Sequence, residues 1–168
     1  MKIFLGADHA GFELKEILKK YLRDDLGYEV SDEGAFMFDP ADDYPDFVRI
    51  VAKRVAGDPT GSSRGIILGG SGQGEAIVAN RFRNVRAAVY YGPPPPDGRA
   101  GKAGEFDVIK LSREHNDANI LSLGARFLTE AEAKRAVKLW LETKASLDPR
   151  HARRIKKIDN PDRAANQF

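Results

Sequence analysis

The chain has 168 residues, 42% hydrophobic and 31% charged, with a formal net charge of +2. This length fits one domain that buries roughly 70% of its unfolded surface, and the near-balanced charge gives no whole-chain reason to expect nucleic acid or an anionic membrane as a partner. The absence of cysteine excludes disulfides, thiolate catalysis and cysteine-based metal sites. The N-terminal segment turns polar at Asp8 and His9, and no apolar run approaches the ~20 residues of a membrane span. We therefore expect a cytoplasmic protein.

Short apolar runs alternate with amphipathic stretches, as in strand–helix–strand units of a parallel sheet. The pattern predicts five strands, at Lys2–Gly6, Tyr28–Asp32, Arg64–Gly69, Arg86–Tyr91 and Ile120–Leu123. It predicts helices at Phe12–Leu26, Tyr44–Ala56, Gly74–Phe82 and Thr129–Leu141, and a basic helix from Asp148 to Ile158. Gly34–Asp43 is predicted to be a loop and Gly92–Glu105 a surface loop. We expect an α/β fold with a five-stranded parallel sheet, a single domain over 1–158, and a C-terminal tail over 159–168.

Polar, glycine-rich segments follow the first and third predicted strands. Gly6–Gly11 contains Asp8 and His9, and Gly69–Glu75 contains four glycines and a serine. Because ligands bind outside the carboxyl ends of parallel strands, we expect both segments at one edge of the sheet.

The segment Gly69–Glu75 has the composition of an anion-binding loop with a carboxylate beside it. Glycines let backbone amides converge on an anion just before a helix, and Glu75 falls in the first turn of that helix, where the dipole favours its ionised form. Such a pair suits removal of a proton next to a carbonyl and stabilisation of the enediolate. The alternative is a tight turn with an acidic residue at a helix start.

Nucleotide-binding motifs do not fit these loops. The spacing of Gly70, Gly72 and Gly74 is not GxGxxG, it follows the third strand, and neither loop ends in the Lys-Ser/Thr of a Walker loop. Asp8 would also place a carboxylate where a pyrophosphate should lie.

The three histidines are His9, His115 and His151. A lone histidine is more often structural than catalytic, but His9 lies at a strand end. The sequence contains no HxH or HExxH spacing, so a metal site has little support.

The predicted last helix is basic. Arg150 and Arg154 are spaced i and i+4, so they share a face and suit a phosphate clamp. A solvated basic helix and a nucleic-acid patch are the alternatives, and the latter lacks interleaved aromatic residues. Arg126 adds a guanidinium after the fifth strand. A base, an enediolate nest, a histidine acid and an arginine clamp are what a cofactor-free sugar-phosphate isomerase needs.

Several motifs resemble the type B ribose-5-phosphate isomerases, in the wider group that includes galactose-6-phosphate and allose-6-phosphate isomerases. The matching segments are 6–15, 43–47, 69–75 with Ala79-Asn80, 113–119, 123–126 and 150–154. They occur in the order of the family and extend over residues 1–158, apart from an insertion at about 92–107.

The resemblance implies a Rossmann-like three-layer α/β/α sandwich and a homodimer or tetramer with active sites shared between subunits. It implies interconversion of ribose 5-phosphate and ribulose 5-phosphate, in the non-oxidative branch of the pentose phosphate pathway, without cofactor or metal. Glu75 is then the base, because other members place a cysteine where this chain has Gly69, and His115 is the acid. The implied substrate ligands and enediolate donors are Asp8, His9, Tyr44, Gly70, Ser71, Gly72, Gln73, Gly74, Asn116, Arg126, Arg150 and Arg154.

The insertion at Gly92–Asp107 departs from the family pattern and lies next to the His115 motif. It leaves the sugar length open, so an isomerase of a six-carbon sugar phosphate is the first alternative. A non-catalytic phosphosugar-binding protein is the second, although a binder needs neither Glu75 nor His115. A nucleic-acid-binding module is a distant third.

Overall fold

A computed structural model of the chain describes residues 1–93 and 107–160. Its centre is a parallel five-stranded sheet in the order β2-β1-β3-β5-β4. The strands are β1 (Lys2–Ala7), β2 (Glu29–Asp32), β3 (Arg64–Gly69), β4 (Ala87–Tyr90) and β5 (Ile120–Gly124). The predicted five-stranded parallel sheet is confirmed.

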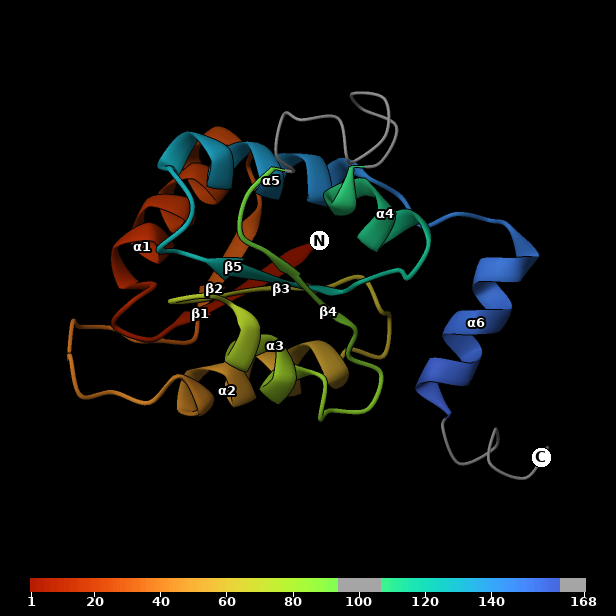
Figure 1. Ribbon diagram of the computed structural model, residues 1–168, viewed down its shortest axis with the longest axis horizontal. Helices are drawn as coiled ribbons and strands as arrows, with labels where there is room; N and C mark the ends of the chain where they lie inside the picture. The colour runs from red at the N-terminus through yellow and green to blue at the C-terminus, as the bar shows by residue number, and fades with distance from the viewer. Residues whose placement is uncertain (94–106, 161–168) are drawn as a thin grey trace.

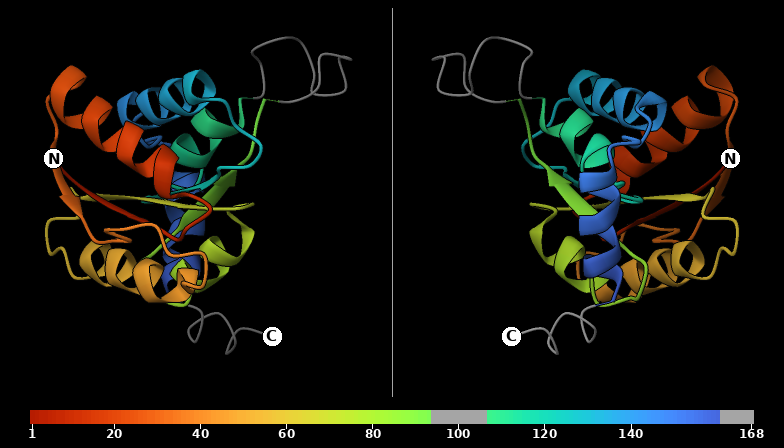
Figure 2. Two further views of the ribbon diagram at one scale, coloured as in Figure 1. Left: turned by 90° about the vertical axis from the view of Figure 1, so that its left-hand side faces the viewer. Right: turned by 90° about the vertical axis from the view of Figure 1, so that its right-hand side faces the viewer.

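Helices cover both faces of the sheet and give three layers (Figures 1 and 2). One face carries α1 (Phe12–Lys20), α4 (Val108–Glu114) and α5 (Glu130–Glu142), and the other carries α2 (Tyr44–Ala56) and α3 (Gln73–Ala79). The last helix, α6 (Pro149–Asp159), stands beside the layers instead of within one.

Each face of the sheet packs on its own hydrophobic core. One core contains Leu18 of α1, Trp140 of α5 and Leu123 of β5, all fully buried. The other contains Val51 of α2 and Ile67 of β3, which are also fully buried. Strands buried on both faces read as continuous apolar runs, as Ile66-Ile67-Leu68 does. This packing holds the carboxyl ends of β1, β3 and β5 side by side, with Leu5 opposite Ile66 and Gly69 opposite Gly124.

Several predicted elements differ from the structure. The predicted helix 12–26 is α1 followed by a π-helical segment, η1 (Tyr21–Asp25). The predicted helix 74–82 ends at Ala79, and α4 was missed. Asp107 caps α4 by accepting hydrogen bonds from the backbone of Ile109 and Lys110.

The C-terminal helix is attached by charged contacts. Arg86 donates to both carboxylate oxygens of Asp159 at 2.9 Å. Helix α6 ends at Asp159, one residue beyond its predicted end. The predicted insertion and tail fall mostly outside the described residues. Within the described part of the chain, no helix has the length and apolar character required to cross a bilayer.

Candidate active site

A cavity of about 400 Å³ lies at the carboxyl edge of β1, β3 and β5. It is lined by Asp8, His9, Ala10, Tyr44, Gly70, Ser71, Gly74, Glu75, Arg126 and Phe127. All of these except Ala10 and Phe127 were candidate site residues of the sequence. The shared edge follows from the parallel sheet, because the segments after β1, β3 and β5 all leave it on that side.

The carboxylate of Glu75 occupies the buried end of this cavity. Glu75 is 4% exposed and lies in the first turn of α3. Its side chain fills the space above Gly69, where a built Cβ would overlap Glu75 Oε1. The lack of a side chain at Gly69 therefore creates the place in which the carboxylate sits.

Burial raises the pKa of Glu75; its own backbone N–H opposes the rise, and the charge of Asp8 adds to it. The sequence suggested that the helix dipole would favour the ionised form, but desolvation outweighs that effect at this position. A carboxylate with a raised pKa is a stronger base than an exposed one, which suits proton abstraction from carbon.

A side chain of β5 supports the glycine-rich loop. Gly72 has a left-handed φ of 76°, and its carbonyl oxygen accepts a hydrogen bond of 2.6 Å from Ser122 Oγ. Ser122 is fully buried and was missed in the sequence because its partner is 50 residues away. Ser71 Oγ accepts a hydrogen bond from the Gln73 N–H at 3.3 Å.

We expect Ser122→Ala to reduce both stability and turnover. The change removes a buried donor to Gly72, which costs about 1 kcal/mol, and it loosens the loop that carries Ser71. Thermal unfolding and steady-state kinetics measure the two effects. Thr143→Val is the control, because Thr143 donates a similar hydrogen bond to the Leu139 carbonyl away from the cavity. A control that lowered turnover as much as Ser122→Ala would contradict a specific effect on the loop.

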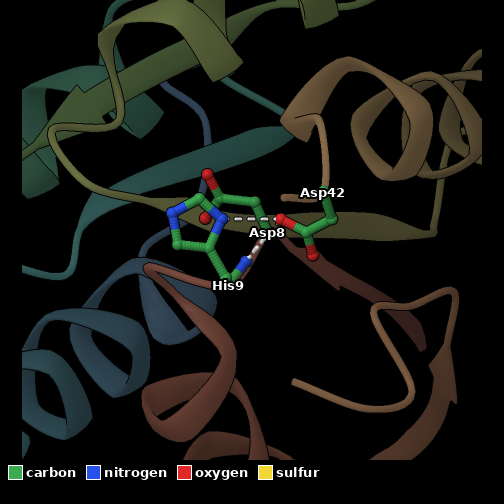
Figure 3. Close-up of side chains that lie close together, drawn as sticks. All are labelled: Asp8, His9 and Asp42. Atoms are coloured by element: carbon green, nitrogen blue, oxygen red, sulfur yellow. Dashed lines mark hydrogen bonds and ion pairs between the residues drawn. The ribbon is translucent and has the colours of Figure 1, made fainter. Parts of the chain in front are cut away.

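The turn after β1 places Asp8 and His9 on the opposite wall. Asp8 Oδ1 accepts hydrogen bonds from the backbone of Ala10 at 3.0 Å and of Gly11 at 3.1 Å. Both the backbone N–H and the ring Nδ1 of His9 contact Asp42 Oδ1, at 2.9 and 2.7 Å (Figure 3). The hydrogen bond to Asp42 raises the pKa of His9, with Asp8 adding to the rise and burial and Arg126 opposing it.

Asp8, His9 and Asp42 also lie close enough to hold a metal ion, with ligand atoms within 4.8 Å of one another. Their contacts already use several of the donor atoms, because His9 Nδ1 bonds to Asp42 Oδ1 and Asp8 Oδ1 bonds to two amides. A metal would have to replace the short His9–Asp42 contact. The described geometry favours a hydrogen-bonded cluster.

Two further side chains complete the mouth of the cavity. The guanidinium of Arg126 lies next to Gly70, 3.3 Å from the position that a Cβ of that residue would take. The Tyr44 hydroxyl lies next to Gly74, 2.7 Å from the corresponding Cβ position there. Arg126 is exposed, as is Phe127 beside it. An exposed cation at the mouth suits an anionic substrate.

Three of the other candidate residues, His115, Asn116 and Arg154, line a separate cavity of about 320 Å³ between α4 and α6. Val108, Leu111, Ser112 and His151 complete its lining. The rings of His115 and His151 stack at 4.2 Å with an interplanar angle of 9°. Burial lowers the pKa of His151, and His115 and Arg150 lower it further. No role for His151 was predicted from the sequence.

The two cavities lie toward opposite ends of the strands. His115 precedes β5 and Arg126 follows it, and a strand of five residues spans roughly 13 Å. One chain therefore does not bring His115, Asn116 and Arg154 to Glu75. Gly72, Gln73 and Arg150 line neither cavity.

Comparisons with known proteins agree with this fold. A family model described as Ribose/Galactose Isomerase matches residues 3–94 and 96–158. Ribose-5-phosphate isomerase B of Mycobacterium tuberculosis H37Rv is 41% identical over 155 residues, which cover 92% of this chain and 86% of that protein. The structure of ribose-5-phosphate isomerase B from Anaplasma phagocytophilum is 39% identical with a TM-score of 0.78, covering 94% of this chain and 95% of that one. The crystal structure of the Mycoplasma genitalium enzyme with bound ribulose 5-phosphate is 32% identical with a TM-score of 0.81, covering 99% and 97%.

The chain belongs to the ribose/galactose isomerase family. Within that family, these relatives and solved structures carry the name ribose-5-phosphate isomerase B.

Proposed function

We propose that this protein interconverts ribose 5-phosphate and ribulose 5-phosphate, the reaction named in its relatives. The buried Glu75 carboxylate beside the glycine-rich loop is the observation that carries the proposal. An aldose–ketose isomerisation moves one proton between adjacent carbons and needs no external oxidant, so a single base and a site for the oxyanion supply its chemistry.

In the proposed reaction, Glu75 removes the proton from C2 of the open-chain aldose. The C2–H electron pair forms the C1–C2 double bond while the π electrons of the C1 carbonyl move onto its oxygen, which gives the enediolate. Ser71 and the backbone of Gly70 and Gly74, which line the cavity, stabilise the negative charge on the enediolate oxygens. A proton passes from the C2 hydroxyl to the C1 oxygen, Glu75 returns its proton to C1, and the C2–O bond becomes the new carbonyl. C2 is thereby oxidised and C1 reduced.

We propose that a second copy of the chain completes the site. His115, Asn116, Arg150 and Arg154 lie on or near the α4–α6 side, away from Glu75 in the same chain. In a two-fold dimer the same pair of surfaces meets twice, so each site would combine Glu75 of one chain with His115 of the other. His115 would then open the furanose ring, and Arg150 and Arg154 would hold the phosphate.

Subunit complementation tests the shared site. Glu75→Gln and His115→Ala should each be nearly inactive alone. In randomly mixed dimers, half are heterodimers and each of these has one intact site, so about a quarter of the wild-type activity should return. An activity assay of the co-expressed mixture measures this, and heterodimers isolated with two affinity tags should show about half of the wild-type activity. If the mixed sample stays inactive, the site is not shared in this way.

Proton NMR of ribose 5-phosphate with the protein in heavy water tests the reaction itself. With a chelator present, loss of the C2 proton signal and appearance of ribulose 5-phosphate are expected. Allose 6-phosphate is assayed in parallel, because the insertion that raised the six-carbon alternative falls mostly outside the described residues. Conversion of allose 6-phosphate alone would move the assignment to the longer sugar, and no conversion of either would favour a phosphosugar-binding protein.

A further inference from the structure

The loop between β2 and α2 brings a buried carboxylate to His9. Asp42 lies at the end of this loop, 33 residues from His9, and its side chain is only 9% exposed. One oxygen, Oδ1, accepts hydrogen bonds from both the backbone and the ring of His9. The sequence pattern predicts a loop over residues 34–43, without a role for Asp42.

The start of the loop is hydrogen-bonded to the end of β1. Where it starts, the Ala7 N–H donates to the Gly34 carbonyl at 2.8 Å and the Ala35 N–H donates to the Ala7 carbonyl at 2.7 Å. Near its end, the Asp42 N–H donates to the Asp39 carbonyl at 3.1 Å. The first two contacts tie the start of the loop to the end of β1, and the last closes a turn within the loop, two residues before α2 begins. Asp42 itself reaches the end of β1 through its two hydrogen bonds with His9.

The ring of His9 has a defined orientation. Nδ1 faces Asp42 and Nε2 lies on the other side of the ring (Figure 3), and the edge of Phe38 packs near it, with ring centroids 6.4 Å apart. With Nδ1–H donated to Asp42, a protonated His9 presents Nε2–H as a donor. His9 lines the cavity, so a substrate oxygen is the partner that this donor suits.

The charge on Asp42 also has one clear counterpart. In residues 1–93 and 107–160, His9 is the only basic group within ion-pair distance of Asp42, and Asp42 Oδ2 has no hydrogen-bond partner. A buried carboxylate without a cation is costly, so it favours the protonated imidazole. The other charged groups facing His9 are Asp8, from the turn after β1, and Arg126, from the segment after β5.

We propose that Asp42 is a positioning residue for substrate binding: it orients the His9 imidazole and serves as its counter-ion, so that Nε2–H binds an anionic oxygen of the sugar phosphate. This inference rests on the proposed isomerase function. Asp42 touches no substrate in this scheme and acts through His9 alone.

Asp42→Asn separates charge from geometry, because the amide oxygen still accepts both hydrogen bonds from His9. We expect the pKa of His9 to fall in this variant. KM for ribose 5-phosphate should rise about tenfold at pH values between the His9 pKa of the variant and that of the wild type, but only slightly below both, where the ring is protonated in both proteins. The turnover number should change less than KM. Asp39→Asn is the matched control, because Asp39 lies exposed on the same loop and its carboxylate accepts a hydrogen bond from the Ala41 N–H instead of from His9.

NMR titration of the histidine ring signals measures the pKa directly. The chain has three histidines, so the signal missing from His9→Asn identifies His9. Asp42→Asn should add no further rise in KM to His9→Asn, because a residue that acts through His9 has nothing left to position. An unchanged His9 pKa, or a KM effect that persists in the His9→Asn background, would overturn the proposal.

Titration of the histidine signals also tests the role of Asp42 independently of the proposed isomerase activity. If the wild-type protein isomerises neither sugar, the proposed function fails. The His9 pKa with and without inorganic phosphate, in the wild type and in Asp42→Asn, still tests the pair. Phosphate should then raise the pKa of His9 in the wild type, and equal shifts in both proteins would contradict a positioning role for Asp42.

Discussion

Glu75→Gln is expected to lower the turnover of ribose 5-phosphate at least about 100-fold while KM changes little. Glutamine has nearly the same shape, so it fits the space above Gly69, but its amide cannot take a proton from C2. Steady-state kinetics, with ribulose 5-phosphate formation as the signal, measure both constants. Glu13→Gln is the matched control, because Glu13 lies exposed in the first turn of α1. Turnover within a few-fold of the wild type would remove Glu75 as the base.

The same assignment predicts the acid side of the pH profile. Glu75 works as a base only when ionised, and burial followed by the charge of Asp8 raises its pKa above the ordinary 4.5. Turnover should therefore fall on acidification at a higher pH than for an exposed glutamate. Asp8→Asn should move that decline toward lower pH, because it removes a negative charge that opposes ionisation. A decline at the ordinary glutamate pKa would contradict the effect of burial.

The raised pKa also fixes the sign of the effect on stability. A group whose pKa is higher in the folded than in the unfolded state stabilises the fold at pH values below its unfolded-state pKa. This contribution is lost as the pH rises through its folded-state pKa. At neutral pH the ionised Glu75 is therefore unfavourable to folding. We expect Glu75→Gln to melt at or above the wild-type temperature at neutral pH, which calorimetry measures, and this result would show that lost turnover does not come from misfolding.

Most of the fold could be predicted because its signals are local in the sequence. Apolar runs such as Ile66-Ile67-Leu68 mark buried strands, and Thr129 marks the start of α5 with a capping box to Glu132. Helix α4 was missed because it has only seven residues and directly follows the inserted segment. The π-helical segment η1 was also missed, since it keeps the same apolar periodicity as the helix before it.

The site was predicted in part. Asp8, His9 and the Gly69–Glu75 loop follow strand ends, so the parallel sheet alone brings them together. Strand direction also separates His115 from them, because it precedes β5 while they follow their strands. Asp42 and Ser122 could not be found this way, because their partners are 33 and 50 residues distant and depend on how the loops pack.

Gly69→Ala is expected to reduce turnover about 10- to 100-fold without altering any catalytic side chain. A Cβ at this position overlaps Oε1 of Glu75. The backbone cannot easily move away, because Gly69 is paired with Gly124 in the sheet and its carbonyl accepts a hydrogen bond from the Ala125 N–H at 2.8 Å. The Glu75 side chain must therefore leave its place, and KM should change less than turnover. Gly57→Ala, at the end of α2, is the control.

A double variant distinguishes displacement of the base from a general disturbance of the loop. If Gly69→Ala acts by moving Glu75, adding it to Glu75→Gln should cause little further loss of turnover, because the displaced group is already inactive. If the two losses multiply, Gly69 matters through its own backbone instead. The overlap also shows that residue 69 and the Glu75 carboxylate compete for one volume: any side chain at position 69 would occupy the place in which Oε1 of Glu75 lies.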